Sequence, residues 1–155
     1  AISPTKFHNS VHNAAVGYWT IGAGAMTPAT AMSAGMGSFA QGLLEALAQR
    51  AAGADAVLLA SYDARSVGPL GRVAPSQGLL GSAVVLGTPG QVGKPQLRAH
   101  LEDGAPSPGN GVLARHAANN AMAPMLPLLD LLAGNGDSVA LYAAPNRVLR
   151  VEIQR

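Results

Sequence analysis

Residues 35–62, GMGSFAQGLLEALAQRAAGADAVLLASY, contain the stretch that decides the fold. Two glycines flank Met36 and turn the chain sharply, and Ser38 follows as a candidate helix cap. Apolar residues then recur at helical spacing as far as Arg50: Phe39, Leu43, Leu44 and Leu47. Residues 56–62 form a short apolar run, typical of a central strand buried on both faces. With a small-residue strand expected at 29–34, this order predicts strand, glycine elbow, helix and strand, which is a right-handed β-α-β crossover.

Further elements are predicted on both sides of this unit. A helix is expected over residues 9–21, ended by the breaker at 22–24, and another over 113–132, broken or kinked by its two prolines. Four strands are predicted from apolar runs or alternation, the last two as a hairpin: 79–86, 96–101, 138–144 and 147–153. Residues 64–76 are interpreted as a loop and 102–111 as the most flexible segment. The expected whole is a single α/β domain over 1–155, with a mixed sheet and buried helices.

The composition excludes several classes of protein. Only 12% of the 155 residues are charged, the formal net charge is +2, and the cations are scattered, so no nucleic-acid binding is expected. No apolar stretch reaches the roughly 18 residues of a membrane span and no signal peptide is recognisable, so a cytoplasmic location is expected. The absence of cysteine excludes a disulfide, a thiolate metal site and a cysteine nucleophile. Because the sequence starts at Ala1, we expect a processed chain or a piece of a longer one.

Two histidines near the start of the sequence form the first candidate site. His8 and His12 stand four residues apart, the spacing by which a helix offers two imidazoles to zinc. Asn9 occupies the position where a metalloprotease helix needs a glutamate base, and no third ligand is evident, so no metal is expected. The favoured interpretation is a hydrogen-bonded His/Asn cluster that fixes a helix start.

The large and the small side chains around these histidines lead to different predictions. Phe7, Tyr18 and Trp19 are expected to be core residues around the first helix. Small residues dominate 14–34, which permits the close approach of another backbone or of a long, thin ligand. An interface or a tunnel is therefore a candidate function of this region.

The turn at 35–38 is the second candidate site. In strand-turn-helix folds such an elbow presents a nucleophile, because the helix dipole and free backbone N–H groups stabilise negative charge. Here Met36 stands at the tip, and its thioether is neither an acid nor a useful nucleophile. Ser38 is interpreted as a cap, with a serine nucleophile as the alternative. The glycine turns at 22–24 and 35–37 lack the dinucleotide fingerprint, and no cofactor is expected.

The first third of the chain resembles a known family. The residues that carry the resemblance are 7–19 (FHNSVHNAAVGYW), Pro28, 33–35 (SAG) and 38–46 (SFAQGLLEA). They resemble the β-ketoacyl synthase-like N-terminal domain family, and look closest to the chain-length-factor-like ketosynthase subunits of bacterial aryl polyene gene clusters. The resemblance implies a thiolase-like fold, here one half of the ketosynthase fold and incomplete at its N-terminus. It also implies that the helix at 9–21 lies near the dimer interface and the acyl pocket, and that the strand at 29–34 pairs across that interface.

In that family the elbow bears the catalytic cysteine, and alignment through Pro28 puts this position at or beside Met36. The resemblance therefore implies a non-catalytic subunit of fatty acid or polyketide-type (aryl polyene) biosynthesis that pairs with a ketosynthase, shapes its acyl tunnel and meets the acyl carrier protein indirectly. Seven residues are candidates for the tunnel or the interface: His8, Asn9, His12, Asn13, Trp19, Met36 and Phe39. Two alternatives remain open: a serine esterase or thioesterase that uses Ser38 with His8 or His12, and a structural homodimer joined through 29–34.

Overall fold

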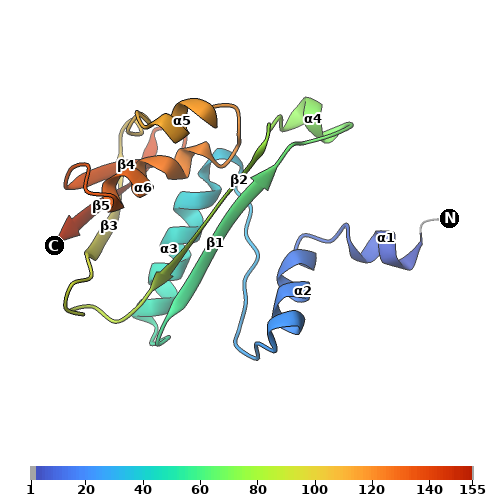
Figure 1. Cartoon of the computed structure of the whole chain (residues 1–155), viewed down its shortest axis with the longest axis horizontal. Helices are drawn as coiled ribbons and strands as arrows, with labels where there is room; N and C mark the ends of the chain where they lie inside the picture. The colour runs from blue at the N-terminus through green and yellow to red at the C-terminus, as the bar shows by residue number, and fades with distance from the viewer. Residues whose placement is uncertain (1–2, 155) are drawn as a thin grey trace. The chain divides into compact units, whose positions relative to one another are not determined.

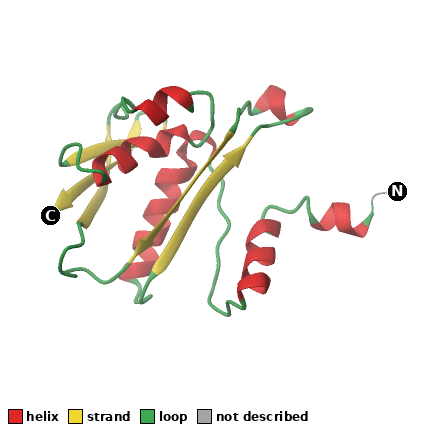
Figure 2. Ribbon diagram, in the orientation of Figure 1, coloured by secondary structure: helices red, strands yellow, loops and turns green. Residues whose placement is uncertain are grey.

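The structure is a computed structural model that describes residues 3–154 (Figure 1). The chain divides into two compact units, Ala1–Ser33 and Ala34–Arg155, and each is described by itself. Figure 2 shows that helices make up the regular structure of the first unit, whereas the second combines helices with strands. A single domain over residues 1–155 stays a prediction.

The first unit contains two short helices, α1 (Pro4–His8) and α2 (Ala14–Ala23). Asn9 is the C-cap of α1 and Asn13 the N-cap of α2, so the one helix predicted over 9–21 is wrong at its start. The physical reason is that asparagine favours helix ends and turns over helix interiors. The predicted breaker is confirmed, since Gly24 ends α2 in the left-handed region at a φ of +61°.

Among the described residues of the first unit, no side chain is fully buried. Neither α1 nor α2 has a buried residue, so the expected core role of Phe7, Tyr18 and Trp19 is wrong. The strand predicted at 29–34 is wrong too, because no residue of that segment is in a strand. Its alanines and serine have low strand propensity, and no strand of the described chain pairs with it.

The second unit begins with the predicted turn and helix. A 3-10 turn, η1 (Gly35–Gly37), leads into α3 (Ser38–Ala51), which buries the stripe Phe39, Ala40, Leu43 and Ala46. This helix contacts strands of both sheets, as Figure 1 shows. The predicted helical spacing at 39–47 is thereby confirmed.

The first sheet pairs β1 (Val57–Ala64) with β2 (Leu79–Leu86). The pairing is antiparallel, with Val57 opposite Leu86 and Ala64 opposite Leu79. The predicted β-α-β crossover is therefore wrong, because residues 29–34 supply no parallel partner for β1. Leu58 and Tyr62 are exposed on one face of β1, so burial on both faces is also wrong.

The second sheet has the order β3-β5-β4 and is antiparallel throughout. Its strands are β3 (Gln96–Asp103), β4 (Ser138–Ala144) and β5 (Arg147–Gln154). The predicted hairpin around Pro145 and Asn146 is confirmed, and Asn146 takes a φ of +59°. Because every described strand pair is antiparallel, the mixed sheet is wrong, whereas the combination of helices and sheets is confirmed.

Short helices connect the strands. They are α4 (Leu70–Val73), α5 (Val112–His116), the 3-10 turn η2 (Ala123–Met125) and α6 (Leu126–Leu132). Pro124 and Pro127 stand in the first turns of η2 and α6, where a missing N–H costs nothing, so the predicted breaks at the prolines are confirmed. The first two residues of the segment predicted as flexible, 102–111, are the last two residues of β3. Ser107 of this segment is hydrogen-bonded to the backbone of Ala140.

The core of the second unit lies where α3, α6 and the second sheet meet. Its most deeply buried members include Leu43, Leu128, Leu141 and Leu149. Leu43 and Leu149 are 106 positions apart in the sequence (149 minus 43), so the core joins α3 to the C-terminal hairpin.

Candidate functional site

The elbow between residue 34 and α3 is the best-defined candidate site of the second unit. Gly35 takes a φ of +56°, a conformation that glycine adopts without strain, and starts the 3-10 turn. Gly37 is the N-cap of α3, so the cap predicted at Ser38 is wrong by one residue. Met36 stands at the tip of the turn, as predicted, with 54% of its surface exposed.

The hydroxyl of Ser38 holds this turn closed. Its Oγ accepts a hydrogen bond from the N–H of Ala34 (2.8 Å) and donates one to the carbonyl oxygen of Gly35 (2.7 Å). Both partners are backbone atoms of the elbow, and within residues 3–154 neither bond involves a histidine. A serine nucleophile needs an adjacent base to take its proton, whereas this proton is directed to a carbonyl.

The elbow rests directly on β4. A Cβ atom built on Gly37 would collide with the carbonyl oxygen of Ala143 and lie 3.1 Å from its carbonyl carbon. The same carbonyl oxygen accepts a hydrogen bond from Nε2 of Gln41, one turn along α3 (3.3 Å). Ala143 is the extra residue of a β-bulge, between the pairs formed by Tyr142 and Ala144, which leaves its carbonyl outside the regular ladder.

The sequence predicted Met36 and Ser38 as site residues but did not predict the contact of the elbow with Ala143 of β4, nor the hydrogen bond from Gln41. Gln41 is a polar residue beside the apolar stripe of α3, and that position is the signal that could have marked it. Nothing local to Ala143 marks the bulge. Phe39, predicted beside Met36 as a tunnel residue, is 2% exposed and belongs to the core, so the elbow does not bring these two side chains together on one surface.

The remaining predicted residues lie in the first unit. His8 packs its ring edge-on to Tyr18, with 5.4 Å between ring centroids, and the Tyr18 hydroxyl donates to Oδ1 of Asn9 (2.9 Å). This contact joins the end of α1 to α2 through Tyr18, so the predicted hydrogen-bonded His/Asn cluster at a helix start is replaced by a ring contact of His8 and a hydrogen bond to Asn9, the C-cap of α1. His12, Asn13 and Trp19 are exposed and are not part of this contact.

The histidine spacing does not produce a metal site. His8 ends α1 and His12 lies beyond it, so the two do not share a helix face. Among the residues that the structure describes, no group of three or more His, Asp or Glu side chains is placed to hold a metal ion.

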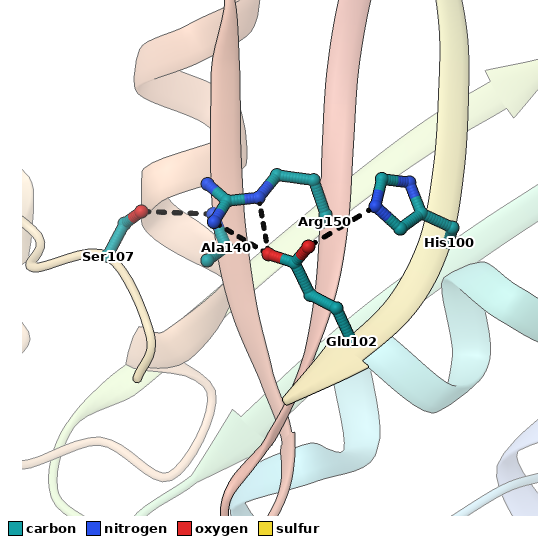
Figure 3. Close-up of polar contacts among 5 residues, drawn as sticks. All are labelled: His100, Glu102, Ser107, Ala140 and Arg150. Carbon is teal, nitrogen blue, oxygen red and sulfur yellow. Dashed lines mark hydrogen bonds and ion pairs between the residues drawn. The ribbon is translucent and has the colours of Figure 1, made fainter. Parts of the chain in front are cut away.

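A polar cluster lies on the second sheet, as Figure 3 shows. Glu102 of β3 accepts from Arg150 of β5 at 2.8 Å (Nε) and 2.7 Å (Nη2), and its other oxygen lies 3.3 Å from Nε2 of His100. The hydrogen bond from Arg150 is the main reason that the pKa of Glu102 lies below its ordinary value. The cluster joins the two strands on an exposed face, where its ionised carboxylate is already satisfied, so we assign it a structural role.

Comparison with known proteins adds one finding. The family model described as "Beta-ketoacyl synthase, N-terminal domain" matches residues 1–135, which include the first unit and the second unit as far as α6, but not β4 or β5. No curated protein and no solved structure matches the chain. Among residues 3–154, no helix has the length and apolar character needed to cross a membrane.

Proposed function

Because this chain belongs to the β-ketoacyl synthase N-terminal domain family, we propose that it is a non-catalytic, chain-length-factor-like partner of a ketosynthase. Its setting would be the cytoplasmic synthesis of aryl polyenes or of related fatty acid or polyketide-type chains. We assign it a thiolase-like fold. The catalytic partner supplies the thiolate and receives the substrate from the acyl carrier protein, while this subunit helps to shape the acyl tunnel.

The side chain at the tip of the elbow carries the proposal. In a condensing enzyme the thiolate attacks the acyl carbonyl, displaces the carrier thiol and holds the chain as a thioester. The sulfur of Met36 already bonds two carbon atoms and has no proton to lose, so it cannot form a neutral thioester. Since residues 1–155 contain no cysteine, none of them can hold the acyl chain as a thioester.

The geometry of the elbow supports a lining role for Met36. Ser38 closes the turn and Gly37 sits on Ala143, so the position of the turn is set on two sides. Met36 itself is half exposed, and a flexible thioether adapts its shape to an apolar neighbour. Phe39 acts in this proposal by holding α3 in the core, and the exposed His12 and Trp19 remain candidates for the interface.

The two alternatives make different demands on the chain. A serine hydrolase would need the Ser38 proton to reach a histidine, and its donation to the carbonyl of Gly35 argues against that use. A structural homodimer would use residues 29–34, which pair with no strand of the described chain. Light scattering of the pure chain, before and after a ketosynthase is added, distinguishes a stable homodimer from a subunit that exchanges partners.

The test of the proposed function is the product of condensation. Purified chain, a ketosynthase from an aryl polyene cluster, and the two together are each incubated with malonyl-acyl carrier protein and a primer, and the acyl chains are measured by mass spectrometry. We expect no product from the chain alone and a changed chain-length distribution when it is added to the ketosynthase. Met36→Trp should shorten the products, whereas Met26→Trp, at a 97% exposed position, should not.

Three results would contradict the proposal. One is condensation by the chain alone, and another is a product distribution that does not respond to its addition. The third is ester hydrolysis by the chain alone that Ser38→Ala abolishes, which would replace the proposal with the serine hydrolase.

A further inference from the structure

A small depression in the second unit lies apart from the elbow. It has a volume of about 390 Å³ and is formed by the loop before α5, by α6 and the turn that follows it, and by the start of β4. Its polar lining residues are Ser107, Asn110, Asp130, Asn135 and Ser138. Pockets that take small ligands span about 300–1,000 Å³, so this one has room for a short side chain or a small molecule.

Asp130 gives the depression its charge. Its side chain is half buried, and none of the ion pairs or side-chain hydrogen bonds found among residues 3–154 engages its carboxylate. Arg115, on the adjoining α5, does not line the depression, and its Nη1 donates to the carbonyl oxygen of the lining residue Asn110 at 2.7 Å. Among the residues that line the depression, Asp130 is the one with a charged side chain, so the lining itself is negative.

The absence of a side chain at Gly111 lets the carboxylate lie where it does. A Cβ atom built there would come within 2.8 Å of Oδ1 and 3.0 Å of Oδ2 of Asp130. The backbone of Gly111 has a φ of −66°, which alanine adopts readily. Substitution with alanine therefore displaces the carboxylate without removing its charge.

The rest of the lining fits one class of ligand. Pro127, Leu131 and Val139 form apolar walls, and two asparagines and two serines add polar groups to the lining, of which the Ser107 hydroxyl already accepts from the N–H of Ala140. We propose that the depression binds a cationic group with several N–H donors on an aliphatic stem, that is, an alkylguanidinium or alkylammonium such as an Arg or Lys side chain. The stem would pack on the apolar walls while the cation pairs with Asp130. This proposal does not depend on the ketosynthase-like role.

The test is a titration of the full chain followed by amide ¹H–¹⁵N NMR. With n-butylguanidinium we expect saturable shifts at Asn110 and Asn135, and with butyrate none. Asp130→Asn should weaken binding by about tenfold, the usual loss when a hydrogen bond to a charged group is removed. Asp55→Asn, which makes the same charge change at an exposed position, should leave it unchanged.

Gly111→Ala provides a second, independent variant, and it should weaken binding while the spectrum of the folded protein is retained. An arginine-containing peptide distinguishes the sources of the ligand: tighter binding than n-butylguanidinium indicates a protein partner, and equal binding indicates a free small molecule. The proposal is overturned by shifts that do not saturate, by an equal response to butyrate, or by equal binding to the Asp130 and Asp55 variants.

Discussion

Replacing Gly37 by alanine tests the close contact between the elbow and the backbone of Ala143 in β4. The backbone at Gly37 has a φ of −85° and a ψ of −1°, which alanine tolerates, so the added methyl group acts only through its contact with Ala143. That contact is with backbone, which cannot rotate away as a flexible side chain would. Overpacking of this kind costs about 1–3 kcal/mol. For a chain of this size the melting temperature should fall by roughly 2–12 °C.

Thermal unfolding followed by circular dichroism measures this change, with Gly87→Ala as the matched control. A Cβ atom at Gly87 would meet the end of the Gln91 side chain at 3.6 Å, an ordinary contact, so the control should melt within about 2 °C of the parent chain. If the melting temperature of Gly37→Ala equalled that of Gly87→Ala, the close approach of the elbow to β4 would be refuted. The Met36 geometry built on that approach would be refuted with it.

Three further changes test the packing and the polar network. Leu128→Ala, at a 0% exposed position, should lower the free energy of unfolding by about 2–5 kcal/mol in urea titrations, whereas Leu79→Ala, at an 80% exposed position, should change it by less than about 0.5 kcal/mol. Asn120→Ala removes bonds from Nδ2 to the carbonyl oxygens of Asp63 and Gln77 and should cost about 1–3 kcal/mol by the same measurement. The pKa of Glu102 is lowered in the folded state, so its contribution to stability is present at neutral pH and is lost as the pH falls through that lowered pKa. Glu102→Gln should therefore make the midpoint of urea unfolding less dependent on pH over the acidic range. A pH profile identical to that of the parent chain would contradict the network.

Elements fixed by short-range signals were predicted well. The hairpin at 138–153 follows from two apolar runs and a Pro-Asn turn, and β2 follows from an apolar run that contains only Gly81 and Ser82 as breaks. Outside this hairpin the strand partners could not be predicted, because a strand with a parallel partner beyond a helix and a strand with an antiparallel partner beyond a loop have the same apolar pattern. Residues 29–34 show the same limit, since small side chains do not reveal whether a partner strand exists.

In the candidate site, too, the features with local sequence signals could be predicted and the contact between distant segments could not. Met36 and Ser38 could be placed on a turn before a helix because glycines and helical spacing are local features. Phe39 and Leu43 share one apolar stripe of the helix, and this pattern predicts that Phe39 faces the core, as it does. The family resemblance suggested a tunnel residue instead, and the structure agrees with the pattern. The support from Ala143 joins residues 106 positions apart (143 minus 37) and depends on a bulge, for which neighbouring residues provide no signal.

The bulge at Ala143 has a practical consequence for work on truncated proteins. A fragment that stopped at residue 135 would retain every position that the family model matches, yet it would lack the carbonyl group that both Gly37 and Gln41 contact. Such a fragment would present its methionine on an unsupported turn. Boundaries for expression should therefore be chosen to retain the last two strands, even though the family match ends before them.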